Sequence, residues 1–125
     1  MSATSITQVG TVIVPVSDQD RALGFWVDKL GFEKRLDGPF GDGHRWLEVA
    51  PPGGTTTIAL VASPEEAGSA TEVSFATGDA EADHAELRRQ GVDADEELIL
   101  MGDHVPPMFT FRDPDGNRFR VVERS

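Results

Sequence analysis

The stretch Thr11-Val-Ile-Val-Pro-Val-Ser-Asp18 predicts how the fold begins, with a strand that leads directly into a helix. Its first six residues are apolar or β-branched, which suits a strand covered on both faces. Ser17 and Asp18 then offer side-chain oxygens that cap a helix, and apolar residues recur at helical spacing until Gly31 supplies a stop. The sequence therefore predicts a strand at 9–16 and a helix at 19–30.

Three further strands complete the first half of the chain. Apolar stretches predict them at 32–36, 44–50 and 55–62. A loop rich in Gly and Pro, running through Gly43, separates the first two, and the turn Pro51-Pro-Gly-Gly54 separates the last two. The predicted order of this half is β-α-β-β-β.

The second half of the chain repeats this order. Setting Asp18 on Asp79 places Val12 on Val73, at the start of another predicted strand and helix. A shift of 63 residues lays the turn Pro51-Pro-Gly53 on Pro114-Asp-Gly116, and with it Trp46 on Phe109 and Ile58 on Val121. Two correspondences in the same order indicate a duplicated module.

We therefore predict one domain at 6–124, with module one at 6–63, a linker at 64–70 and module two at 71–124. A single module has a sheet that it cannot cover, so two modules are expected to curl a mixed sheet around a shared concave cup. The predicted fold class is α+β, and the cup is the default ligand site.

Composition excludes several classes of function. The 125 residues include 22 acidic and 11 basic side chains, and the net charge of -11 opposes binding to a nucleic acid or an anionic membrane surface. The absence of cysteine excludes disulfides, thiolate metal sites and thiol nucleophiles. No segment has the pattern of a signal peptide or the roughly 20 apolar residues of a membrane span, so we expect a cytoplasmic protein.

Four stretches of the chain resemble the vicinal oxygen chelate superfamily, which includes glyoxalases, bleomycin resistance proteins and extradiol dioxygenases. They are Val14-Pro-Val-Ser-Asp18, Arg21-Ala-Leu-Gly-Phe-Trp26, Lys29-Leu-Gly-Phe32 and Phe109-Thr-Phe-Arg-Asp-Pro-Asp-Gly-Asn117. The resemblance covers nearly the whole chain. It implies the glyoxalase/bleomycin resistance/dioxygenase fold and a homodimer, but the same scaffold serves lyases, dioxygenases, transferases and binding proteins without metal.

Enzymes of that superfamily hold one divalent metal with four side chains in the cup. The resemblance places the corresponding positions at Thr11, Glu72, Arg120 and either Ala59 or Thr57. Among them Glu72 alone could bind a cation, and the guanidinium of Arg120 repels a dication and is suited to hold an anion. We therefore expect no cofactor and no metal at the usual site.

Several alternatives remain open for the polar residues. A relocated divalent metal site could use His44, Glu48, Glu72 and His104, although histidines in loops that contain glycine are commonly solvated. Glu48 and Glu72 could neutralise Arg120 as an ion pair. They could also accept a hydrogen bond from a ligand, or act as a general base in catalysis.

The sequence favours a protein that binds a small molecule in its cup without the usual metal. The alternative is a metal-dependent lyase resembling lactoylglutathione lyase, an isomerase or a dioxygenase with a rearranged ligand set, and a third reading is an interaction domain whose cup is filled. The expected ligand-binding residues are Thr11, His44, Trp46, Glu48, Ala59, Glu72, His104, Phe109 and Arg120. Trp46 and Phe109 are expected to lie symmetrically about the cup, as partners in the repeat.

Overall fold

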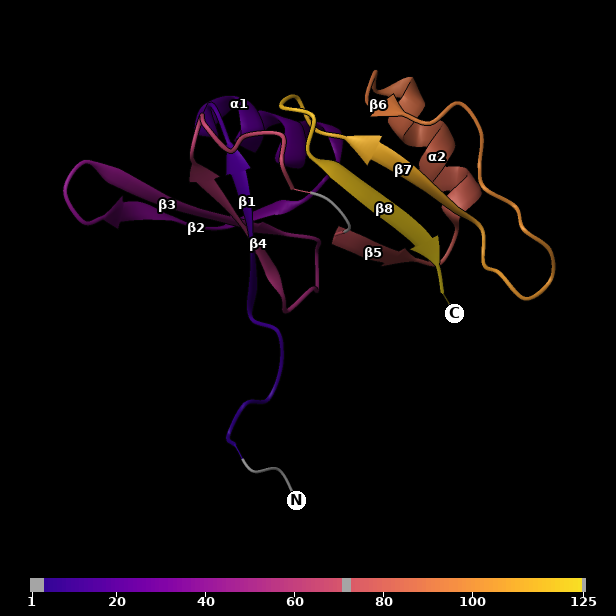
Figure 1. Ribbon diagram of the computed structural model, residues 1–125, viewed down its shortest axis with the longest axis horizontal. Coiled ribbons are helices and arrows are strands. Elements are labelled where there is room, and N and C mark those ends of the chain that lie inside the picture. Colours follow the sequence, from indigo (N-terminus) through magenta and orange to yellow (C-terminus); the bar gives the residue numbers. More distant parts are fainter. Residues whose placement is uncertain (1–3, 71–72, 125) are drawn as a thin grey trace.

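The computed structural model describes residues 4–70 and 73–124, in which each half of the chain forms a sheet of its own (Figure 1). The first half contains β1 (Thr11–Val16), α1 (Gln19–Gly24), the π-helical turn η1 (Phe25–Lys29), β2 (Glu33–Phe40), β3 (His44–Ala50) and β4 (Thr57–Ala62). The second half contains β5 (Val73–Thr77), α2 (Ala80–Arg89), β6 (Asp93–Ala94), β7 (Met108–Arg112) and β8 (Arg118–Glu123). The predicted α+β class is confirmed.

The two sheets have the same topology. Their strand orders are β1-β4-β3-β2 and β5-β8-β7-β6, and in both sheets the first strand of the module runs parallel to its last strand. In the described ranges no strand of one sheet pairs with a strand of the other, so the molecule has two four-stranded sheets rather than one continuous curled sheet. None of the helices in these ranges is long and apolar enough to cross a membrane.

The predicted helix at 19–30 is divided in two. Asp18 caps α1, since its Oδ1 accepts a hydrogen bond from the backbone N–H of Arg21 at 3.0 Å. The helix then widens into the π-helical turn η1 and ends before Gly31, whose φ of 76° lies in the left-handed region that glycine tolerates. The neighbouring rings of Phe25 and Trp26 are both buried as a result of this path.

Strand β2 is longer than predicted. It continues through Gly38 and Pro39 to Phe40, where the sequence had indicated a loop. The extension is possible because β2 is the outermost strand of its sheet, where the N–H that proline lacks has no neighbouring strand to bond. The hairpin therefore turns at 41–43, and Phe40 pairs with His44.

The two modules share one hydrophobic core. Trp26 of η1 is fully buried, and its ring centroid lies 5.9 Å from Phe75, 6.2 Å from Phe111 and 4.9 Å from Phe119, all on the second sheet. The helix-facing side chains of both sheets belong to the same cluster. Neither half has a complete core alone, which is the physical reason for the duplication.

The turn from Asp113 to Asn117 ties the second module to the first. The fully buried Asn117 donates from Nδ2 to the backbone oxygen of Pro15 at 2.8 Å, and its Oδ1 accepts from the N–H of Ala70 at 2.9 Å. Asp113 accepts from the N–H groups of Asp115 and Asn117, as the predicted turn requires. Burial raises the pKa of Asp113, although these hydrogen bonds oppose the shift.

Candidate functional site

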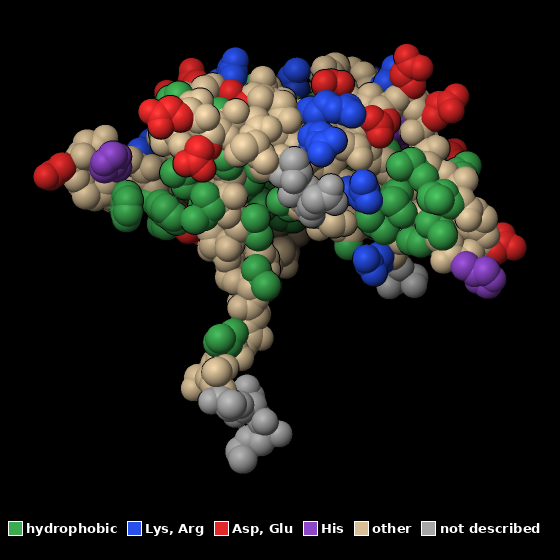
Figure 2. All heavy atoms as spheres, in the orientation of Figure 1, with side chains coloured by type: hydrophobic (Ala, Val, Ile, Leu, Met, Phe, Trp, Pro, Cys, Tyr) green, Lys and Arg blue, Asp and Glu red, His purple; other side chains and the backbone are tan. Residues whose placement is uncertain are grey.

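One face of the first sheet is not covered by any helix of the described residues. We call the side of each sheet that points away from the shared core its open face. On the first sheet, strand pairing aligns Ile13, Ala59, Glu48 and Leu36 in one row across this face. Figure 2 shows hydrophobic side chains gathered over this sheet and beside the segment that precedes β7. The exposed side chains of Ile13, Leu36 and Phe40 belong to the first group.

A carboxylate is fixed in the middle of this open face. The indole Nε1 of Trp46 donates to Glu48 Oε2 at 2.6 Å, and the hydroxyl of Thr57 donates to Glu48 Oε1 at 2.7 Å. The hydroxyls of Thr57 and Thr11 lie 2.9 Å apart and share a further hydrogen bond. Since both oxygens already have a donor, the carboxylate is held in one orientation and keeps lone pairs for another donor.

Aromatic rings stand beside this carboxylate. The ring centroid of Phe40 lies 5.4 Å from that of Trp46 and 6.3 Å from that of His44. These rings belong to the β2–β3 hairpin, which projects beyond the rest of the sheet in Figure 1. The open face therefore combines an apolar surface with one oriented acceptor, an arrangement suited to an apolar molecule that carries a hydrogen-bond donor.

An ion-pair network supports the hairpin from the helix side. Arg45 donates from Nε and Nη2 to the carboxylate of Asp37 at 2.8 and 2.9 Å, and from Nη1 to Asp20 at 2.7 Å. The same hydrogen bonds from Arg45 lower the pKa of Asp37. Arg45 thus links β2 and β3 to the helix and fixes the direction of the strands that carry the aromatic rings.

The structure brings five of the predicted site residues onto this one face. They are Thr11, His44, Trp46, Glu48 and Ala59. Ala59 is fully buried beneath its neighbours, whereas His44 is exposed at the hairpin end. Phe40 was not predicted as a site residue, because Gly38 and Pro39 concealed the continuing strand. Thr57 was predicted only as an alternative to Ala59 at one of the metal positions.

Arg120 lies on the open face of the second sheet, beside Thr110 and Ser74 in the strand register. Within the described residues Arg120 takes part in no ion pair, so the predicted neutralisation by Glu48 is not found. The other predicted partner, Glu72, falls outside the described residues. Among the described residues, no carboxylate neutralises the guanidinium of Arg120, so this group can bind an anionic ligand group.

Phe109 does not lie on an open face. It is fully buried on the helix side of its sheet, 5.1 Å from the ring of His84. Ala59 and Arg120 are equivalent positions of the two sheets, and strand pairing places Glu48 beside Ala59 and Thr110 beside Arg120. Trp46 precedes Glu48 by two residues and Met108 precedes Thr110 by two, so the partner of Trp46 in the repeat is Met108. The predicted shift of 63 was wrong by one residue for β7, which exchanges the two faces of a strand, and by two residues for β8, where Phe119 rather than Val121 is the partner of Ile58.

The described residues do not fit the metal that the resemblance implies. Thr11 is engaged with Thr57, Ala59 has no donor atom, and Arg120 is a cation. In the ranges 4–70 and 73–124, no three His, Asp or Glu side chains are grouped to hold a metal ion. His104 is exposed in the loop before β7, and Glu72 of the relocated set falls outside the described residues.

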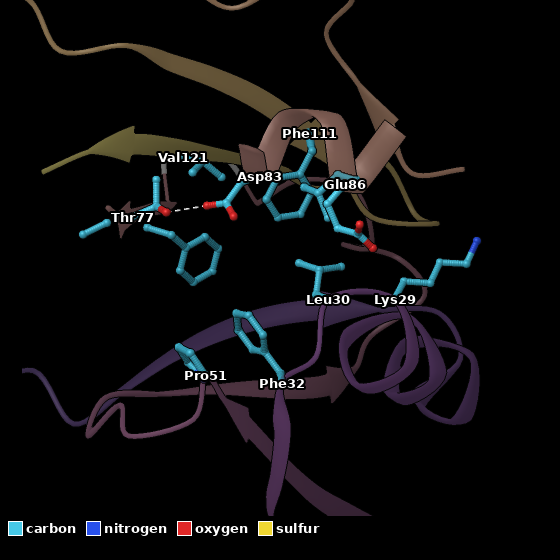
Figure 3. Close-up of a pocket in the computed structure, with 12 residues that line it drawn as sticks. Lys29, Leu30, Phe32, Pro51, Thr77, Asp83, Glu86, Phe111 and Val121 are labelled. Atoms are coloured by element: carbon cyan, nitrogen blue, oxygen red, sulfur yellow. Dashed lines mark hydrogen bonds between the residues drawn. The ribbon is translucent and has the colours of Figure 1, made fainter. Parts of the chain in front are cut away.

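A second feature, a pocket of about 280 Å³, was not anticipated from the sequence. It lies on the helix side, between the two modules (Figure 3). Its walls come from η1, β5, α2 and the turn at Pro51, so its lining residues are scattered over both halves of the chain. No local pattern could have indicated it.

Comparisons with known proteins agree with this architecture. The model of the Glyoxalase/Bleomycin resistance protein/Dioxygenase superfamily matches residues 8–121. The Bacillus subtilis (strain 168) protein YetH is 33% identical over 123 residues, which cover 94% of this chain and 99% of that protein.

Two solved structures are similar over nearly the whole chain. TnmS3, an antibiotic binding protein from Streptomyces sp. CB03234, is 35% identical with a TM-score of 0.85 and coverage of 98% of this chain and 99% of that one. A superfamily member from Sphaerobacter thermophilus DSM 20745 is 32% identical with a TM-score of 0.88, covering 97% and 100%. The chain therefore belongs to the glyoxalase/bleomycin resistance protein/dioxygenase superfamily.

Proposed function

We propose that this protein binds a small, largely apolar organic molecule of the antibiotic type and releases it unchanged. The observation that carries the proposal is the Glu48 carboxylate, held by Trp46 and Thr57 on an open face beside exposed apolar side chains. A ligand would lie on the rings of Phe40 and Trp46 and donate a hydrogen bond to Glu48. The similarity to the antibiotic binding protein TnmS3 supports the same class of function.

We propose that binding needs no metal ion. In support, three of the four positions at which the superfamily's enzymes place ligands hold Thr11, Ala59 and Arg120, which do not form a site for a divalent cation. Metal analysis of the purified protein by mass spectrometry tests this point. A tightly held metal in a ratio of about one per chain would instead favour the lyase or dioxygenase alternative.

We also propose that the binding protein is a homodimer in which a second copy covers the open faces. Ile13, Leu36 and Phe40 are 60%, 51% and 56% exposed on one open face, an unusual density of large apolar side chains on a surface. The open face of the second sheet carries the cation of Arg120, and that of the first sheet carries the carboxylate of Glu48, so the two faces have complementary charges. Burial in a dimer would make both features part of one ligand site.

Ligand binding can be measured by the fluorescence of Trp46. Titration with a set of polycyclic aromatic antibiotics should quench or shift this emission, and chromatography with mass spectrometry should recover the compound unchanged. Glu48→Gln keeps the shape but removes the charge, so it should weaken a ligand that donates a charge-assisted bond by about 1.5–3 kcal/mol. The titration is made in a Trp26→Phe background, in which Trp46 is the remaining tryptophan, and Trp46→Phe in the same background gives the spectroscopic blank.

Two outcomes would contradict this proposal. Conversion of the compound during incubation would show that the protein is an enzyme. Equal affinities of the wild-type protein and of folded Glu48→Gln would show that the ligand makes no charge-assisted hydrogen bond to this carboxylate. For the dimer, sedimentation of Phe40→Glu as a monomer is expected, with Glu97→Lys, a charge change on an exposed residue, as the control.

A further inference from the structure

The pocket between the modules is separate from the open faces. Figure 3 shows it between α2 and the second sheet on one side and the end of η1 and the Pro51 turn on the other. Its volume of about 280 Å³ is too small for a large antibiotic and is sufficient for one ring with a short side chain. A ligand in it would contact both halves of the chain.

The pocket lies at a junction where the two repeats differ. At the junction of β1 and α1, the Asp113–Asn117 turn is bound through Asp115, which accepts hydrogen bonds from Ser17 and Arg21. The equivalent positions at the junction of β5 and α2 are Gly78 and Ala82, which have no side chain that could bind a turn. The facing turn, Pro51-Pro-Gly-Gly54, contains no carboxylate. One junction is therefore sealed, and its counterpart is left open.

The inner wall of the pocket is aromatic and aliphatic. The ring centroid of Phe75 lies 5.7 Å from that of Phe32 and 6.4 Å from that of Phe111, and all three rings line the pocket. Leu30 and Leu87 add aliphatic surface from the two modules. This wall favours an apolar group, and the rings also present faces that attract a cation.

The polar lining is mainly acidic. Asp83 and Glu86 stand on adjacent turns of α2 at the edge of the pocket, and Asp83 Oδ2 accepts a hydrogen bond from the hydroxyl of Thr77 (Figure 3). Glu86 is paired with Arg89 through two hydrogen bonds, of 3.0 and 2.6 Å. In Figure 3 the ammonium group of Lys29 points away from the rings.

Asp83 is thus the carboxylate that remains available to a ligand. Its Oδ1 receives no hydrogen bond within the described residues. The net charge of -11 on the whole chain also raises the local concentration of cations and lowers that of anions.

We propose that this pocket is a second binding site, which takes a small organic cation consisting of one aromatic or branched alkyl group and an ammonium group. The apolar group packs against Phe32, Phe75 and Phe111. The ammonium group donates to Asp83 Oδ1 at the edge, where the charge stays close to water. This site does not depend on the ligand proposed for the open face.

Phenethylammonium is a suitable probe, with 3-phenylpropanoate as a probe of similar size and opposite charge. We expect isothermal titration calorimetry to detect binding of the cation, and nuclear magnetic resonance to show amide shifts at Phe75 and Leu87 but not at Trp46 or Glu48. Asp83→Asn can still accept from Thr77 and should weaken the cation by about tenfold. Glu81→Gln changes an exposed carboxylate on the same helix that does not line the pocket, so it should leave the affinity unchanged.

Each of the other results would overturn the proposal. Equal binding of 3-phenylpropanoate would show that the pocket does not select positive charge. Unchanged affinity in folded Asp83→Asn would remove the role of that carboxylate. Absence of binding to the wild-type protein, or amide shifts confined to Trp46 and Glu48, would show that the pocket does not bind this class of molecule.

Discussion

Asp115 Oδ1 lies 2.9 Å from Arg21 Nη2, across 94 residues of sequence, and joins the last turn of the second module to the first helix. The same carboxylate accepts hydrogen bonds from the N–H and the hydroxyl of Ser17. The side chain of Asp115 is only 9% exposed, although that of Arg21 is 50% exposed. This contact therefore fixes how the two modules are oriented, and with them both candidate sites.

Replacement of Asp115 should loosen the interface between the modules. Asp115→Ala removes three hydrogen bonds to the first module, and we expect a loss of about 1–3 kcal/mol in the free energy of unfolding, measured by urea denaturation. Asp20→Ala is the matched control, because its ion pair with Arg45 is exposed and should contribute less than about 1 kcal/mol. Equal losses in the two variants would contradict the special role of Asp115.

Substitutions at Gly68 and Gly116 distinguish the energetic cost of a steric clash from that of backbone strain. Both have a left-handed φ, of 92° and 89°, so an alanine at either position should cost about 1–2 kcal/mol. A Cβ at Gly68 would also lie 2.5 Å from the backbone oxygen of Asp115, whereas one at Gly116 would meet nothing within 4 Å. We expect Gly68→Ala to lower the thermal unfolding temperature clearly more than Gly116→Ala does. The reverse order would exclude close packing between the linker and the turn.

Asp113 and Asp37 should affect stability with opposite dependence on pH. Burial raises the pKa of Asp113 in the folded state, so the protein should lose stability relative to Asp113→Asn as the pH rises through that folded-state pKa. Arg45 lowers the pKa of Asp37, so its contribution should be present above the unfolded-state pKa and be lost as the pH falls through the folded-state value. Urea unfolding of both Asn variants and of the wild-type protein between pH 2 and 7 checks the two signs, and the same sign for both would contradict these assignments.

The environment of Trp46 should depend on Glu48 even without a ligand. Glu48→Ala leaves the indole N–H without its acceptor at 2.6 Å, so we expect a shift in the emission maximum of Trp46. The measurement is made in a Trp26→Phe background, in which Trp46 is the remaining tryptophan. Glu33→Ala, at an exposed position on the same sheet, should leave the emission unchanged. Identical spectra for the two variants would show that the hydrogen bond is absent in solution.

The sequence by itself determined the modular order of the fold. The β-branched stretch at 11–16, the cap at Asp18 and the turn at 113–117 are local patterns, because each depends on backbone preferences of adjacent residues. The same patterns occur in the same order in both halves, which predicted the duplication that the two identical sheet topologies confirm. Strand alternation was also sufficient to place Trp46 and Glu48 on a common face.

Register was decided only by the tertiary structure. The length of the loops before the last strands hides a shift of one residue, and such a shift moved Phe109 from the expected open face to the core. Likewise, Gly38 and Pro39 suggested a loop, but their place on an edge strand permits β2 to reach Phe40. Neither outcome can be obtained from the residues adjacent to these positions.

The contacts between the modules likewise depended on tertiary structure. The bond from Asp115 to Arg21 and the pocket beside Asp83 each require side chains from both modules. Pairwise packing across a shared core selects such contacts, and no periodicity along the chain encodes them. The sequence thus specified the two modules and the polar residues of one sheet face, whereas their packing decided which junction closed and which remained a pocket.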